Sequence, residues 1–107
     1  MSNNLIGRFY FKQTSNGNLI GEFSNNLSDG IATESADSIG KTNNYIGDYN
    51  STWQENGKRR FSNLKISQKA GTSNTIFTLE WTDNGRQIFL GEGMLCDNIL
   101  IGDYRGV

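Results

Sequence analysis

Leu5-Ile6-Gly7-Arg8-Phe9 is the first copy of the five-residue pattern that decides the fold: a large apolar residue, Ile, Gly, a charged residue and an aromatic residue. The pattern returns, the last time in degenerate form, as Leu19-Ile20-Gly21-Glu22-Phe23, Tyr45-Ile46-Gly47-Asp48-Tyr49, Leu100-Ile101-Gly102-Asp103-Tyr104 and Phe89-Leu90-Gly91-Glu92-Gly93. The intervals between copies are unequal, so the chain is not a solenoid of regular repeats. We interpret the pattern as one type of β-strand that the chain uses several times.

Alternation within this pattern predicts which side chains point inward. In a strand, every second residue shares a face, so the large apolar residue, the Gly and the aromatic residue point one way. The charged residue should meet solvent. The opposite face, which carries the Gly and the aromatic residue, should therefore point into the interior. A Gly inside a strand lets the strand coil tightly and leaves space for an aromatic ring from its neighbour. We favour this structural interpretation over the alternative that the glycines clear a ligand cavity.

Turn signals divide the chain into short antiparallel strands. Asn-Gly pairs at Asn56-Gly57 and Asn84-Gly85 are typical of two-residue hairpins. The segment 31–39 is ambiguous because Ala, Glu and Ser weaken it as a strand, but we favour a strand there and a turn at 40–44. The expected strands are 5–12, 18–24, 31–39, 44–54, 59–68, 75–82, 87–95 and 99–105. The connections are too short for parallel crossovers.

These strands predict an all-β fold, an eight-stranded antiparallel up-and-down meander barrel formed by one domain over residues 1–107. An open meander would leave two unpaired edge strands, and closure into a barrel removes them. A two-sheet sandwich is the alternative, but the even spacing of the hairpins favours the barrel. On the same alternation we expect Leu64, Ile66, Phe77 and Leu79 to point into its core.

Composition limits the classes of function. The chain has no histidine and one cysteine, Cys96, which leaves out the usual general base, the usual zinc ligands and any intrachain disulfide. We therefore expect no enzyme, no metal site and no cofactor. The net charge is −1, so nothing points to nucleic acid or to a membrane surface. The polar first residues contain no apolar targeting segment, and the cytoplasm is the expected location.

Aromatic residues are the candidate ligand-binding residues. Trp is a frequent anchor in pockets, so Trp53 and Trp81 are expected to stack on a ligand ring at one mouth of the barrel. The same alternation turns further side chains inward, and they could offer hydroxyls to the ligand: Tyr45, Tyr49, Ser51 and Tyr104. The competing interpretation is that the Trp side chains plug the barrel ends and the Tyr side chains fill the core.

Other polar clusters have simpler structural explanations. Lys58-Arg59-Arg60 is the densest basic stretch, and alternation splits it over two faces, which is typical of a solvated hairpin. Asp83-Asn84-Gly85 and Asp97-Asn98 lack the spacing of a calcium loop and are expected to form turns. Cys96 has no cationic or histidine partner in the sequence pattern and is expected to be unreactive.

The outward Ile residues form a second apolar set on the barrel wall, at Ile6, Ile20, Ile46 and Ile101. Single exposed Ile residues are ordinary. Several on neighbouring strands are typical of a surface between protomers, so we expect a homo-oligomer, a dimer or higher.

The opening hairpin resembles that of avidin-like barrels, a calycin-type family. Gly7-Arg8-Phe9-Tyr10 followed by a turn and Leu19-Ile20-Gly21-Glu22-Phe23 is similar to the family's Gly-x-Trp strand, loop and Leu-x-Gly-x-Tyr strand. Leu79-Glu80-Trp81-Thr82 is similar to the strand whose indole walls the biotin pocket. The resemblance implies an avidin-like barrel, oligomers and an unidentified small ligand. Phe9 replaces the first-strand Trp, and the segment 87–95 has no capping Trp, so biotin is not the expected ligand. The Gly-rich strands that end in aromatic residues also resemble, more loosely, short bacterial proteins labelled fibronectin-binding.

Three non-catalytic functions compete at this point. The first is a binding module for a small apolar or aromatic ligand held at one end of the barrel. The second is an oligomeric structural or protein-interaction subunit with a filled barrel, in which the loop 25–30 is a candidate contact. The third is a carbohydrate-binding lectin that uses exposed aromatic and Asn or Asp side chains.

Overall fold

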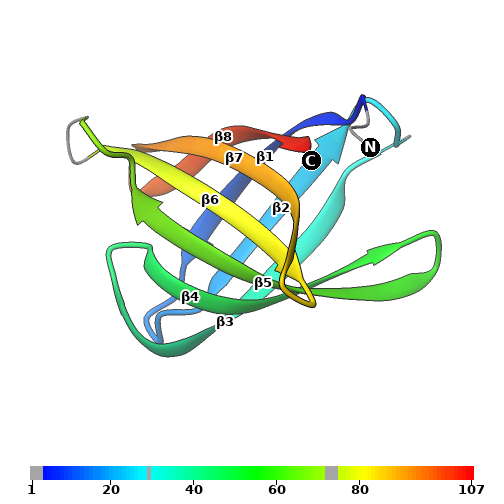
Figure 1. Ribbon diagram of the computed structural model, residues 1–107. Coiled ribbons are helices and arrows are strands. Elements are labelled where there is room, and N and C mark those ends of the chain that lie inside the picture. The colour runs from blue at the N-terminus through cyan, green and yellow to red at the C-terminus, as the bar shows by residue number, and fades with distance from the viewer. Residues whose placement is uncertain (1–3, 29, 72–74) are drawn as a thin grey trace.

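The computed structural model describes residues 4–28, 30–71 and 75–107. These residues form a closed antiparallel barrel in which each strand pairs with the next along the chain and the last pairs with the first (Figure 1). The strands are β1 (Ile6–Gln13), β2 (Leu19–Asn25), β3 (Ala32–Asn43), β4 (Ile46–Glu55), β5 (Lys58–Gln68), β6 (Ile76–Asp83), β7 (Arg86–Cys96) and β8 (Ile99–Gly106). The predicted eight-stranded up-and-down barrel is confirmed.

The hairpins follow the local chemistry of their turn residues. Asn56-Gly57 and Asn84-Gly85 take positive φ at both positions, which matches the right-handed twist of the flanking strands. Asp97-Asn98 does the same between β7 and β8. These three predicted turns are confirmed.

The turn between β3 and β4 lies later than predicted. The segment 40–44 was expected to turn, but β3 continues to Asn43 through an irregularity in its pairing with β4. Gly40 takes a φ of 82° within this irregular stretch, and Asn44 and Tyr45 then form the hairpin with φ values of 50° and 77°. The sequence signal failed because Tyr45 is a bulky residue that rarely adopts a positive φ. The segment 72–74 of a predicted turn, and Asp29 of the predicted loop 25–30, lie outside the described residues.

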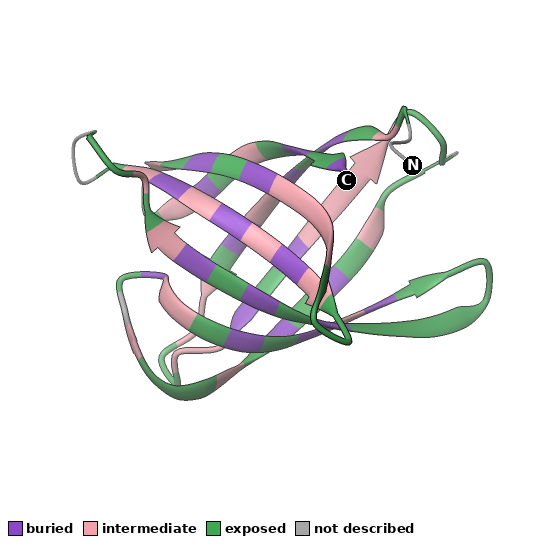
Figure 2. Cartoon of the chain, in the orientation of Figure 1, coloured by how far each residue is buried: buried purple, intermediate pink, exposed green. Residues whose placement is uncertain are grey.

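Burial alternates along the strands as the five-residue pattern predicts (Figure 2). The inward set is buried and forms the core: Phe9, Phe11, Leu19, Ala36, Tyr45, Tyr49, Trp53, Leu64, Ile66, Phe77, Leu79, Trp81, Leu100 and Tyr104. Ile6, Ile20 and Ile101 are exposed on the outer wall, whereas Ile46 is half-buried against the core. The register of the barrel is therefore strongly specified, because a one-residue slip of a strand would turn its inward side chains outward.

Gly7 shows why glycine occupies the centre of the pattern. A Cβ atom placed on Gly7 would lie 2.4 Å from the Tyr104 ring, which comes from the neighbouring strand β8. At Gly21 a Cβ would lie 1.9 Å from the carbonyl oxygen of Tyr10 and 2.8 Å from the Phe11 ring. The space at these two glycines is therefore filled by close backbone and rings, as the structural interpretation predicted.

Up-and-down order divides the connections between the two barrel ends. The end that carries the β1–β2, β3–β4 and β7–β8 connections is called the closed end. The end that carries the chain termini, the β2–β3 segment and the β4–β5 and β6–β7 hairpins is called the open end (Figure 1). The β4–β5 hairpin projects beyond the barrel, and its residues 54–61 are exposed, so the basic stretch lies in solvent as predicted.

Candidate functional site

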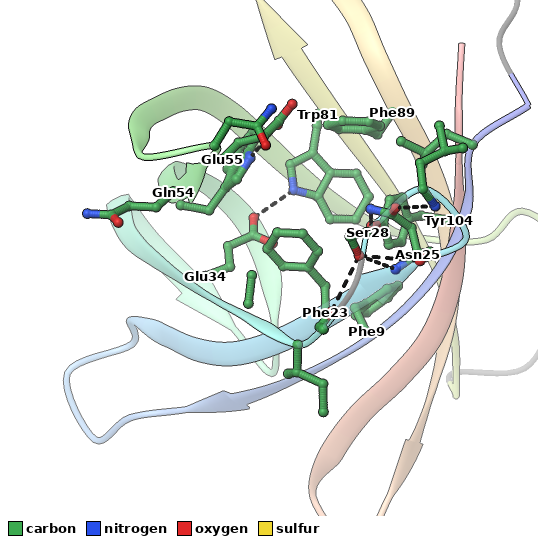
Figure 3. A pocket seen from close by; sticks show the side chains of 17 residues that line it. Phe9, Phe23, Asn25, Ser28, Glu34, Gln54, Glu55, Trp81, Phe89 and Tyr104 are labelled. Atoms are coloured by element: carbon green, nitrogen blue, oxygen red, sulfur yellow. Dashed lines mark hydrogen bonds between the residues drawn. The ribbon is translucent and has the colours of Figure 1, made fainter.

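A cavity of about 650 Å³ lies at the open end of the barrel. Exposed residues such as Leu27, Ser28 and Gln54 stand among its lining, so the cavity reaches the surface. Strands β1 to β4 and β6 to β8 all contribute to the lining. The full set is Leu5, Phe9, Phe23, Asn25, Leu27, Ser28, Gly30, Ile31, Ala32, Glu34, Trp53, Gln54, Glu55, Asn56, Trp81, Phe89 and Tyr104 (Figure 3).

Six aromatic side chains wall this cavity: Phe9, Phe23, Trp53, Trp81, Phe89 and Tyr104. The ring centroids of Phe89 and Tyr104 are 5.6 Å apart, and those of Trp81 and Tyr104 are 5.9 Å apart. Several contacts are edge-to-face, the arrangement that aromatic quadrupoles favour. The rings therefore hold one another in place on strands, with their faces and edges directed at one shared space.

Glu34 is the polar centre of the site. It lies near the start of β3, two residues after Ala32, and points inward with only 6% of its surface exposed. Its Oε2 accepts a hydrogen bond of 2.8 Å from the indole Nε1 of Trp81 and another from the hydroxyl of Ser51. Figure 3 shows the carboxylate directed at the Trp81 indole among the aromatic rings.

Burial sets the protonation of Glu34. Desolvation raises the pKa of its carboxyl from 4.5 to about 7, against the lowering effect of the hydrogen bonds from Ser51 and Trp81. The site therefore carries a carboxyl that changes charge near neutral pH, in a chain without histidine.

A second polar group of the lining is Tyr104. Its hydroxyl accepts a hydrogen bond of 3.1 Å from the side-chain amide of Asn25. Burial raises the pKa of Tyr104, and the charges of Glu34 and Glu55 raise it further. Both carboxylates thus act on this part of the cavity.

The charge of the lining has one sign. Glu34 and Glu55 are its acidic members, and none of the described lining residues is Lys or Arg. Glu55 is exposed at the end of β4, at the rim, where its carboxylate accepts a hydrogen bond of 3.3 Å from the indole Nε1 of Trp53. The mouth is therefore negative wherever these groups are ionised.

The sequence-predicted site residues separate into two groups. Trp53, Trp81 and Tyr104 line the cavity, and Ser51 lies beside it as a hydrogen-bond donor to Glu34. Tyr45 and Tyr49 are buried at the closed end and are not among the lining residues.

Hydrogen bonds fill the closed end. The hydroxyl of Tyr49 donates to the carbonyl of Tyr45 at 2.7 Å and accepts from the side chain of Gln13 at 3.2 Å. The Tyr45 hydroxyl lies 2.9 Å from the carbonyl oxygens of Phe11 and Asn98 and accepts the Gln13 backbone N–H at 3.1 Å. Burial raises the pKa of Tyr49 to about 12, so both hydroxyls stay protonated as donors. These two residues act as a plug at this end of the barrel.

Sequence reasoning missed the central residue of the cavity. Alternation alone does not predict Glu34, because a charged residue in a strand is expected to meet solvent and the segment 31–39 is ambiguous as a strand. A signal did exist in the sequence, because alternate residues of a strand share a face. Glu34 shares its face with the small residues Ala32 and Ala36, and small residues are typical of an inward face that packs against bulky aromatic rings.

Comparisons with protein-family models, with curated proteins and with solved structures give no significant match to this chain. The avidin-like resemblance of the opening hairpin therefore stays a prediction. The described residues contain no helix of the length and apolar character needed to cross a membrane.

Proposed function

We propose that the protein is a non-catalytic binding module that holds a small, largely apolar or aromatic ligand in the cavity at the open end. One observation carries the proposal: an aromatic-walled cavity of about 650 Å³ that reaches the surface and encloses one buried carboxyl group. Pockets for small molecules commonly measure about 300–1,000 Å³ and combine apolar walls with a few placed polar groups.

The contrast between the two barrel ends supports this function over a wholly filled barrel. At the closed end, Tyr45, Tyr49 and Gln13 satisfy one another through hydrogen bonds and occupy the interior. At the open end, the rings pack edge to face around a space that they do not fill. Side chains held on strands make a more precise site than side chains on loops, which favours a defined ligand.

Placed polar groups would orient that ligand. Glu34 is buried, the Tyr104 hydroxyl is bonded to the Asn25 amide at the end of β2, and Glu55 is exposed at the end of β4. A lectin is less well supported, because Trp53 and Trp81 are buried, 7% and 3% exposed, and form no outward platform for a sugar ring.

A fluorescence screen against a library of small aromatic compounds tests this function, because both Trp side chains line the cavity. Ala32→Phe fills the cavity from β3, whereas Thr33→Phe adds the same bulk on the exposed face of the same strand. We expect hits that saturate, that disappear in Ala32→Phe and that persist in Thr33→Phe. A screen without hits, or hits that bind both variants equally, would contradict the function.

We also propose, as a second candidate, self-association through the outer face of β8, β1 and β2. Ile20 and Ile101 are exposed there. Arg8 and Lys12 share the face with Glu22 and Asp103, so a two-fold axis can bring opposite charges together. Light scattering after size-exclusion chromatography would show a dimer that Ile20→Asp with Ile101→Asp dissociates and Ile39→Asp on β3 does not. A monomer at high protein concentration would rule it out.

A further inference from the structure

Glu34 is a buried carboxyl that lacks a cationic partner. Among the described residues, the salt bridge between Lys69 and Glu92 is the one ion pair, and it lies on the exposed surface. Buried carboxylates are normally paired with a cation, because an uncompensated charge in an apolar environment is costly. When Glu34 is ionised, none of the described side chains supplies its counter-charge.

The carboxyl has unused capacity to accept hydrogen bonds. Both protein donors, the Trp81 indole and the Ser51 hydroxyl, bind Oε2. Oε1 accepts no hydrogen bond from any side chain in the described part of the chain, and Glu34 lines the cavity. An ionised carboxylate offers about four acceptor sites over its two oxygens. A donor group on the ligand can therefore reach Oε1 without breaking a bond that the protein makes.

The aromatic wall favours a positive ligand as well. Ring faces attract a cation within about 6 Å of the centroid, most strongly for Trp. Trp81 and Trp53 both line the cavity, and Trp53 is paired with Glu34 in the register of β4 and β3. The described lining adds the carboxylate of Glu55 and contributes no Lys or Arg that would repel a cation.

We infer that the cavity selects an ammonium ligand: an amine with an aryl or alkyl body, whose charged nitrogen donates to Oε1 of Glu34 while the body packs against the aromatic rings. This inference rests on the proposed binding function and narrows it to one chemical class. It follows from a carboxyl oxygen of a buried residue that the described side chains leave unpaired, a cation-attracting wall and a lining of one charge sign.

Ammonium binding should depend on pH. The titratable groups of the described lining are Glu34 on β3, Glu55 at the end of β4 and Tyr104 on β8, whereas β1, β2, β6 and β7 contribute Phe9, Phe23, Trp81 and Phe89. Because an ammonium stabilises the ionised carboxylate, its affinity should rise from pH 5 to pH 8. A neutral ligand of the same shape should show no such rise.

Calorimetric titration with three matched compounds tests the inference: phenethylammonium, 2-phenylethanol and 3-phenylpropionate. We expect the ammonium to bind at least about tenfold more tightly than the alcohol at pH 8, and the carboxylate to bind most weakly. Glu34→Gln should remove most of the ammonium preference, measured as the ratio of the ammonium affinity to the 2-phenylethanol affinity. Glu92→Gln, an exposed acid outside the cavity, is the matched control and should leave the preference intact.

The outcomes separate this inference from the function on which it rests. If the alcohol or the carboxylate binds as tightly as the ammonium, or if Glu34→Gln keeps the ammonium preference, the ammonium inference is overturned while the binding function stands. If none of the three binds and the aromatic library also gives no hits, both are overturned. Should Glu34→Gln fail to fold, the pH series on the unmodified protein decides: a flat ammonium affinity between pH 5 and pH 8 contradicts the inference.

Discussion

The indole Nε1 of Trp81 lies 2.8 Å from Oε2 of Glu34, across the interior of the barrel from β6 to β3. The two residues belong to strands that are not neighbours in the sheet. Their hydrogen bond fixes the carboxyl inside the aromatic wall, and Oε1 accepts no side-chain hydrogen bond within the described residues. The binding site depends on this pair, because it combines the aromatic and the polar components of the cavity.

Glu34 should make the stability of the fold depend on pH. Its carboxyl has a pKa of 4.5 when unfolded and about 7 when folded, so the folded state binds more protons between these values. The contribution of Glu34 to the free energy of unfolding should therefore be largest below pH 4.5. It should fall by about 3 kcal/mol as the pH rises toward and through 7. Glu34→Gln should lack this loss.

Urea unfolding of the unmodified protein and of Glu34→Gln, from pH 4 to pH 8.5, measures this loss of stability. The free energy of unfolding of Glu34→Gln minus that of the unmodified protein should increase with pH over this window. Parallel pH profiles would show that Glu34 has no raised pKa.

Removing the indole N–H should move the titration of Glu34. That hydrogen bond lowers the pKa of Glu34, so Trp81→Phe should raise it above about 7 while keeping an aromatic ring in place. The ¹³C resonance of the Glu34 carboxyl, followed by NMR against pH, measures the change. Trp53→Phe is the control, because the Trp53 indole donates to Glu55 instead. An unchanged midpoint in Trp81→Phe would mean that the bond does not form in solution.

Substitutions at the closed end should lower the stability of the protein without changing its affinity for the ligand. Tyr49→Phe removes a hydroxyl that donates to the Tyr45 carbonyl and accepts from Gln13. Leaving such buried partners unsatisfied costs about 1–3 kcal/mol in the free energy of unfolding. We expect this loss in urea unfolding, with ammonium affinity within about twofold of the unmodified protein. A large loss of affinity would place the ligand at the closed end instead.

Gly7 should tolerate no side chain, since a Cβ there would lie 2.4 Å from the Tyr104 ring. Gly7→Ala is expected to cost about 1–3 kcal/mol, as overpacking of a core does, and to push the Tyr104 ring into the cavity. Gly30→Ala is the matched control, because nothing lies within 4 Å of its added Cβ. Thermal melting compares the two variants, and equal midpoints would argue against the close contact.

The sequence predicted the barrel well because its signals were local. Period-two alternation assigned the inward faces of Tyr49, Trp53 and Trp81, and Asn-Gly pairs marked two of the hairpins. The turn at Asn44-Tyr45 was placed too early because an aromatic residue at positive φ is held there by Gln13, whose side-chain carbonyl accepts the Tyr45 N–H at 3.0 Å. That contact joins residues distant in the chain, and no local rule contains it.

The site was only partly predictable for the same reason. Trp53, Trp81 and Tyr104 could be predicted as inward aromatic residues. Strand register decides that they lie at the open end while Tyr45 and Tyr49 lie at the closed end, and the sequence does not give that register. Glu34 could not be chosen, because the Trp81 indole and the Ser51 hydroxyl that accommodate its carboxyl come from other strands.

A two-dimensional NMR titration of the protein with phenethylammonium shows directly whether the open-end cavity binds an ammonium ligand, because the two Trp side chains of the chain both line the cavity. We expect saturable shifts of the Trp53 and Trp81 indole resonances and of amides next to Glu34 and Tyr104, while the amide resonances around Tyr45 and Tyr49 do not shift. Indole resonances that do not move, or shifts confined to the outer wall or the closed end, would contradict binding in this cavity.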